Sequence, residues 1–133
     1  MNNRNHHKGF LHFLVMNIVL LLLCLPSNPL FAQLSGNYTI GSGGDFTNFT
    51  EAVSALHTQG ISSDVTFNVI SGTYNEQIVL QNFTGMTLYT VKFQSQEGVA
   101  DSVTLWFESE TFDFNYVVKL DGVRNITFQN LTF

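Results

Sequence analysis

Apolar and polar residues alternate with a period of two over most of the second half of the chain. Val65, Phe67 and Val69 alternate with polar neighbours, which is the pattern of a strand with one buried face. Turn residues such as Ser71 and Gly72 follow this segment. Short strands are predicted in the same way at residues 37–40, 65–69, 91–93, 103–107, 117–120, 126–128 and 131–133.

One segment follows the helical period instead. Its apolar stripe, with spacings of three and four residues, consists of Phe49, Ala52, Val53 and Leu56. Asn48 precedes the stripe as a good N-cap, and Glu51 can reach back to the amide of Asn48 in a capping box. Gly60 is suited to end the segment. The sequence therefore predicts a helix over residues 48–59.

A short phrase, apolar-Thr-apolar, recurs along the strand-rich part and behaves as a degraded repeat. Its copies are Val65-Thr66-Phe67, Val103-Thr104-Leu105, Ile126-Thr127-Phe128 and Leu131-Thr132-Phe133. Asn130 can adopt the left-handed conformation of a sharp bend between two strands. One coil of a solenoid takes about 20 to 29 residues, so roughly three coils fit. We predict a mainly β fold, a parallel β-helix whose first coil is covered by the helix.

The N-terminal region has the pattern of an export signal. Residues 10–25 are almost wholly apolar, after the basic Arg4 and Lys8 and before Pro26. Sixteen residues form about 24 Å of helix, which is short of the roughly 30 Å of a membrane core. This favours a signal peptide at 1–32, cleaved after Ala32. The expected location of the mature part, residues 33–133, is secreted or on the outer cell surface, with no stable membrane span.

Net charge and cysteine content argue against nucleic-acid binding and against thiol chemistry. The mature part holds all ten acids against Lys92, Lys119 and Arg124, a net charge of −7, which disfavours nucleic acid as a partner. The single cysteine, Cys24, lies in the signal, so the mature part has no thiol chemistry. The bulky residue before Cys24 favours an apolar filler over a lipoprotein cysteine. His57 is the only mature histidine, and we expect it to be a surface residue.

Four segments together are similar to a known family. They are Gly43-Gly44-Asp45-Phe46, Glu51-Ala52-Val53, Val65-Thr66-Phe67-Asn68-Val69 and Gly72-Thr73-Tyr74-Asn75-Glu76. This succession resembles the N-terminal cap and first coil of the pectin-lyase-like superfamily, which includes pectinesterases, and more closely such segments in secreted or surface proteins of Bacteroidota. The resemblance spans about residues 37–133 and implies a right-handed parallel β-helix. In pectinesterases the catalytic residues lie on later coils, so it assigns no catalytic residue here.

Acidic and aromatic side chains gather in one stretch. They are Trp106, Phe107, Glu108, Glu110, Phe112, Asp113 and Phe114. One interpretation is a sugar-stacking platform whose carboxylates bind calcium or act as acid and base. The other, which we favour, is a solvated loop between coils whose aromatic residues pack on the solenoid. The spacing matches no calcium loop, so no catalytic, metal-binding or cofactor-binding residue is predicted and no cofactor is expected.

Three functions agree with these patterns. The first is an exported, non-catalytic surface or secreted module that acts as a scaffold, an adhesin or a glycan-binding stalk. The alternative is the N-terminal cap of a polysaccharide-acting enzyme, like a pectinesterase or a polysaccharide lyase, with its active site downstream. The third is a stand-alone small lectin. Because Phe133 lies in an apolar strand, we expect a C-terminally incomplete domain, with polysaccharide or downstream coils of the same polypeptide as partners.

Overall fold

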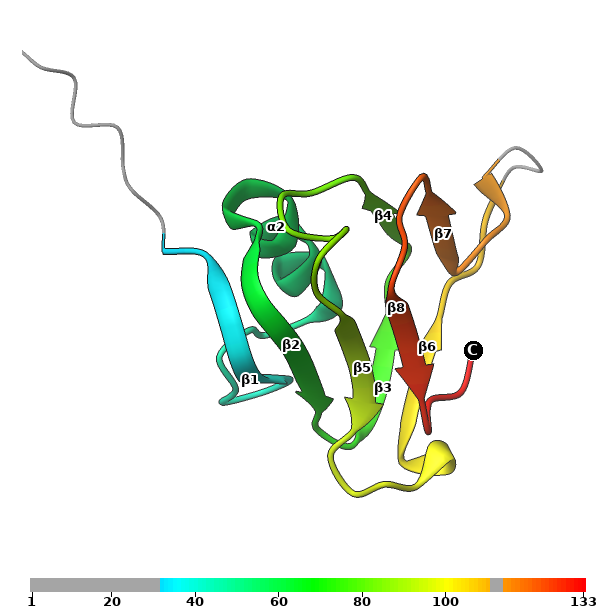
Figure 1. The fold of residues 1–133 in the computed structure, drawn as a ribbon. Coiled ribbons are helices and arrows are strands. Elements are labelled where there is room, and N and C mark those ends of the chain that lie inside the picture. The colour runs from blue at the N-terminus through cyan, green and yellow to red at the C-terminus, as the bar shows by residue number, and fades with distance from the viewer. Residues whose placement is uncertain (1–31, 111–113) are drawn as a thin grey trace, which may run out of the picture. The chain divides into compact units, whose positions relative to one another are not determined.

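One helix and eight short strands form within the part of the chain that the computed structural model describes, residues 32–110 and 114–133 (Figure 1). A 3-10 turn, Ala100–Ser102, precedes the sixth strand. The elements are β1 Leu34–Ile40, α2 Phe49–Gln59, β2 Ile61–Val69, β3 Gly72–Asn75, β4 Ile78–Gln81, β5 Val91–Ser95, β6 Val103–Trp106, β7 Val118–Asp121 and β8 Ile126–Gln129. None of the helices in this part is long and apolar enough to span a membrane.

The strands form three small parallel sheets. The largest has the order β1-β2-β5-β8, and β3-β6 and β4-β7 are pairs. Figure 1 shows the four strands of the largest sheet side by side, with α2 near the β1 and β2 end. The helix packs against β4 and β1. The mainly β composition and the parallel pairing agree with the strand pattern in the sequence.

The prediction of a solenoid, a right-handed parallel β-helix of roughly three coils, is wrong. The described residues form three separate parallel sheets of four, two and two strands, and no solenoid is found among them. The repeated phrase contributed to this prediction, and its copies lie in two different sheets. Two copies are in β2 and β8 and a third is in β6, whereas Thr132 makes only an isolated bridge to Thr104. The phrase therefore marks a strand with one buried face, and it occurs in more than one sheet.

The predicted helix is confirmed, with one change at its start. The Asn48 side chain accepts a hydrogen bond from the Glu51 amide at 2.8 Å, and Gly60 ends the helix with a φ of 69°. The predicted apolar stripe is buried throughout, together with Ala55. The Glu51 carboxylate, however, accepts from the amide of Thr47 at 2.8 Å, one residue before the predicted partner.

A column of three stacked phenylalanines runs through the core. The parallel register places Phe67 beside Phe93, and Phe93 beside Phe128. Their ring centroids are 4.8 Å and 5.3 Å apart, with interplanar angles of 19° and 16°. Phe67 and Phe93 are fully buried, while Phe128 is partly exposed. The same sheet therefore has a buried interior strand and a partly open last strand.

The three strands that carry this column share a four-residue pattern. The pattern is aliphatic, polar, Phe and amide, in the order of the chain. It occurs as Val65-Thr66-Phe67-Asn68 in β2, Val91-Lys92-Phe93-Gln94 in β5 and Ile126-Thr127-Phe128-Gln129 in β8. On the outer face, the Gln94 side-chain amide donates to the Asn68 side-chain oxygen at 2.9 Å. Like side chains therefore contact like side chains from strand to strand.

Removal of the central ring should be costly. Phe93→Ala deletes a fully buried side chain between two stacked neighbours. We expect the free energy of unfolding to fall by about 3–5 kcal/mol, because the core loses the transfer energy of the ring and keeps part of the cavity. Urea denaturation measures this change. Lys92→Thr is the matched control, since threonine already stands in the same column at Thr66 and Thr127, and a similar loss in that variant would contradict the account.

Candidate functional site

The segment from Gly72 to Glu76, one of the four that carry the family resemblance, connects three elements of the fold. Gly72–Asn75 is strand β3, paired with β6. The Tyr74 hydroxyl donates to the backbone oxygens of Ile70, at 2.7 Å, and Ile40, at 3.4 Å. The ring of Tyr74 meets Phe49 edge-on, with centroids 5.2 Å apart. Burial, followed by the charge of Glu76, raises the pKa of Tyr74, so its hydroxyl stays a donor.

Glu76 caps the start of the helix from a distant part of the chain. Its carboxylate accepts from the amides of Phe49 and Thr50, at 3.1 Å and 2.8 Å. It also accepts from the Thr50 hydroxyl at 2.6 Å. The first amides of a helix have no partner within the helix and carry partial positive charge, which favours a carboxylate there. Glu76 therefore joins α2 to the turn between β3 and β4.

Two aspartates also bind backbone amides. Asp45 accepts from the amide and the hydroxyl of Thr39, both at 2.8 Å, and these bonds lower the pKa of Asp45. Asp64 accepts from the amide of Thr90 at 2.8 Å. Each aspartate thus holds a loop beside the largest sheet. No partner was predicted for either aspartate: Asp45 bonds across a turn to a residue six positions away, and Asp64 bonds to a residue 26 positions away.

His57, the single histidine among the described residues, has a structural partner. His57 lies near the end of α2, and its Nε2 accepts from the Gln81 amide at 3.1 Å, although the residue is exposed as predicted. Burial of part of the ring lowers the pKa of His57. A hollow of about 230 Å³ adjoins it, lined also by Thr50, Val53, Ser54, Gln77, Ile78 and Val79. Neutral His57 therefore links the helix to the end of β4.

The acidic and aromatic stretch does not form a metal centre in the described part. Glu108 and Glu110 are exposed, while Phe112 and Asp113 lie outside the described residues. The side chains of Trp106 and Phe114 are 39% and 60% exposed. Within residues 32–110 and 114–133 no group of three or more metal-binding side chains comes together. The favoured interpretation as a solvated segment stays a prediction for the residues outside this range.

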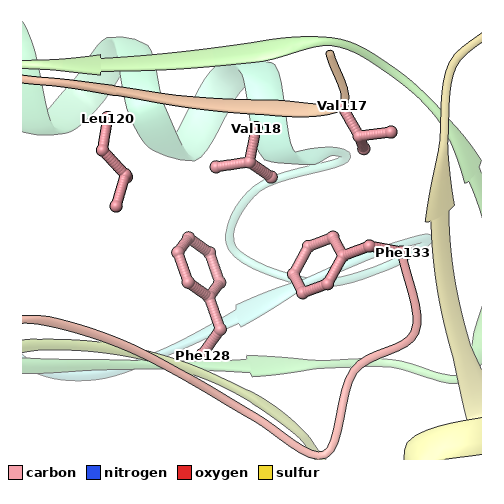
Figure 2. A pocket seen from close by; sticks show the side chains of 5 residues that line it. All are labelled: Val117, Val118, Leu120, Phe128 and Phe133. Carbon is pink, nitrogen blue, oxygen red and sulfur yellow. The ribbon is translucent and has the colours of Figure 1, made fainter.

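An apolar hollow lies between the last strands of two sheets. It has a volume of about 530 Å³ and is lined by Val117, Val118, Leu120, Phe128 and Phe133. Figure 2 shows the three aliphatic side chains facing the two phenylalanine rings across the gap. Leu120 and Phe133 are 55% and 54% exposed. Sequence analysis placed these residues in strands but did not find the hollow, because it arises where β7 and β8 end their sheets.

An asparagine with a positive φ lies directly before β8 and another directly after it. Asn130 has a φ of 54°, which confirms the predicted left-handed bend. Asn125 also has a positive φ, of 59°, which sequence analysis did not predict. Its side-chain amide donates to the Met86 oxygen at 3.0 Å, and its backbone oxygen accepts from Val91 at 2.9 Å. Both asparagines therefore set the direction of β8 and of the segment after it.

Comparison with protein-family models, curated proteins and solved structures finds no match for this chain. The resemblance to the pectin-lyase-like superfamily therefore stays a prediction from the residues.

The contribution of Glu76 can be measured directly. Glu76→Gln keeps the shape of the side chain but removes the charge that accepts from Phe49 and Thr50. We expect a loss of about 1–3 kcal/mol in the free energy of unfolding, since hydrogen bonds to a charged group are the stronger ones. Urea denaturation followed by circular dichroism gives the value. Glu97→Gln, an exposed change in a turn, is the control, and equal losses in both variants would contradict the capping role.

Stability should fall in acid in two separate pH windows. The pKa of folded His57 is below its ordinary value of 6.5, so the unfolded chain binds the proton first, and stability falls as pH drops from about 6.5 toward the lower folded pKa. Asp45 and Glu51 have folded pKa values below their ordinary 3.8 and 4.5. Their contribution is therefore present above those values and is lost below them.

His57→Gln separates the two windows. Glutamine keeps a side-chain acceptor for the Gln81 amide but does not titrate. Urea midpoints between pH 8 and pH 3 should lose the upper step and keep the lower one. A variant that retains the full upper step would show that another group causes it.

Proposed function

We propose that this chain is an exported, non-catalytic β-sheet scaffold module of the cell surface or the secreted fraction. One observation carries the proposal: four ionisable side chains accept hydrogen bonds from backbone amides of the chain itself. Glu76 holds the start of the helix, His57 holds the end of β4, and Asp45 and Asp64 hold loops. Side chains that accept hydrogen bonds from backbone amides stabilise the fold. They also have fewer lone pairs available for a substrate.

The surface chemistry supports an extracellular scaffold. The part after the signal carries ten acids and three cations, and a net charge far from zero favours solubility. The outer faces of the strands carry Thr, Asn and Gln side chains, as in the column of Asn68, Gln94 and Gln129. An amide column of this kind strengthens the contact between neighbouring strands without introducing a reactive group.

Turnover assays test the absence of catalysis. The exported chain is incubated with pectin and with a panel of neutral and acidic polysaccharides, and released methanol, unsaturated products and reducing ends are measured. We expect no turnover above the blank. Turnover would overturn the proposal if it purifies with the chain and disappears in a folded Glu76→Gln or His57→Gln variant. That result would favour a polysaccharide-acting enzyme. Retardation in gels that contain the same polysaccharides tests binding separately.

Export predicts a defined new N-terminus. When the full chain is produced in a Gram-negative host, the product outside the cytoplasm should begin at Gln33, because Ala32 supplies the small residue that signal cleavage requires. N-terminal sequencing or intact mass measures this. Ala32→Trp should leave a longer product in the membrane fraction. Recovery of the unprocessed chain in the cytoplasm would contradict export.

A further inference from the structure

The largest sheet is covered at one end and open at the other. At the β1 end, the amide of Phe46 donates to the Thr39 oxygen and the amide of Gly41 donates to the Phe46 oxygen. The rings of Tyr38 and Phe46 lie 5.9 Å and 5.8 Å from the ring of Phe67. These contacts occupy part of the outer edge of β1 and cover the first ring of the phenylalanine column.

The β8 end lacks such a cover within the described residues. No strand there pairs with the outer edge of β8. Ile126 and Phe128 are only partly buried, and Phe133 touches Phe128 edge-on at 5.5 Å. The apolar hollow adjoins the same ring. A strand edge with free backbone groups and an apolar face can bind another strand.

The contact between β5 and β8 indicates which kind of strand could pair with the outer edge of β8. Each strand in this part of the sheet places an aliphatic residue, a polar residue, a phenylalanine and an amide in register with its neighbour. At β8 these are Ile126, Thr127, Phe128 and Gln129. A parallel strand with the same pattern would stack its ring on Phe128 and pair its amide with Gln129, as Gln94 pairs with Asn68. It would also place apolar surface over the hollow.

We propose that the outer edge of β8 binds an extended peptide segment with the pattern aliphatic, polar, Phe, amide, as a further parallel strand. Backbone hydrogen bonds supply affinity and the Phe128 face supplies selectivity. The pattern continues an interface that already exists twice in the chain, which distinguishes this occupant from an arbitrary apolar ligand. Head-to-tail growth from copies of this chain is disfavoured, because the loop around Phe46 covers the β1 edge. The inference does not depend on export or on the absence of catalysis.

A synthetic peptide with the sequence of residues 63–71 is the probe, because it carries the β2 form of the pattern. A fluorescent label at its N-terminus reports binding to the full chain by anisotropy. We expect saturable binding, and a peptide with Phe67→Asp should bind at least about tenfold more weakly, because the aromatic anchor is lost. A scrambled peptide of the same composition should lose binding as well. This comparison uses the native protein and so does not depend on the folding of a variant.

Variants of the protein give the second test. Phe128→Asp should weaken binding of the native peptide at least about tenfold. Thr127→Lys should leave it within about twofold, since Lys92 already occupies that column in β5. Equal binding of the native and Phe67→Asp peptides, or no saturation up to millimolar peptide, would overturn the proposal. Sedimentation that shows a dimer which excess peptide does not dissociate would also overturn it and assign the β8 edge to a second copy.

Discussion

The in-register stacking of Phe67, Phe93 and Phe128 is the contact on which the rest of this structure depends. The strands run parallel and in register, so the three rings stand directly beside one another, and a shift by one residue would turn the rings of one strand to the other face. The same register then places polar residues together on the outer face and aliphatic residues together inside. The two smaller sheets follow from it, since the segments between these strands form β3 with β6 and β4 with β7.

Polar side chains connect the helix and the loops to this stack. Glu76 is the clearest case, because one carboxylate satisfies two helix amides and a hydroxyl. His57 and Asp64 each accept one hydrogen bond from a backbone amide that is distant in the sequence. Unpaired backbone groups at these positions would be costly. These ionisable side chains therefore have a structural role in the fold, and this role supports the proposed scaffold function.

Local patterns predicted local structure well. The helix, its Asn48 cap and its Gly60 end follow from spacing and capping chemistry within a few residues, and Asn130 follows from its conformational preference. The arrangement of the strands did not follow. The apolar-Thr-apolar phrase describes one buried face of a strand and does not by itself specify how the sheets are built, and the solenoid predicted from it was wrong. β3 and β4 were missed because neither alternates: β3 has Tyr74 as its one apolar side chain, and β4 begins with three apolar residues in a row.

The site was less predictable than the fold, for a physical reason. The hollow beside Phe128 and the contacts of Glu76 and His57 arise between segments far apart in the sequence, and no local pattern records such pairs. Among the described residues, the largest sheet is covered at β1 and has no strand beyond β8. Amide hydrogen exchange resolved by residue tests this most directly. We predict slowest exchange in β2 and β5, at Phe67 and Phe93, and exchange at least about tenfold faster in β8. Exchange in β8 as slow as in β5 would contradict the account.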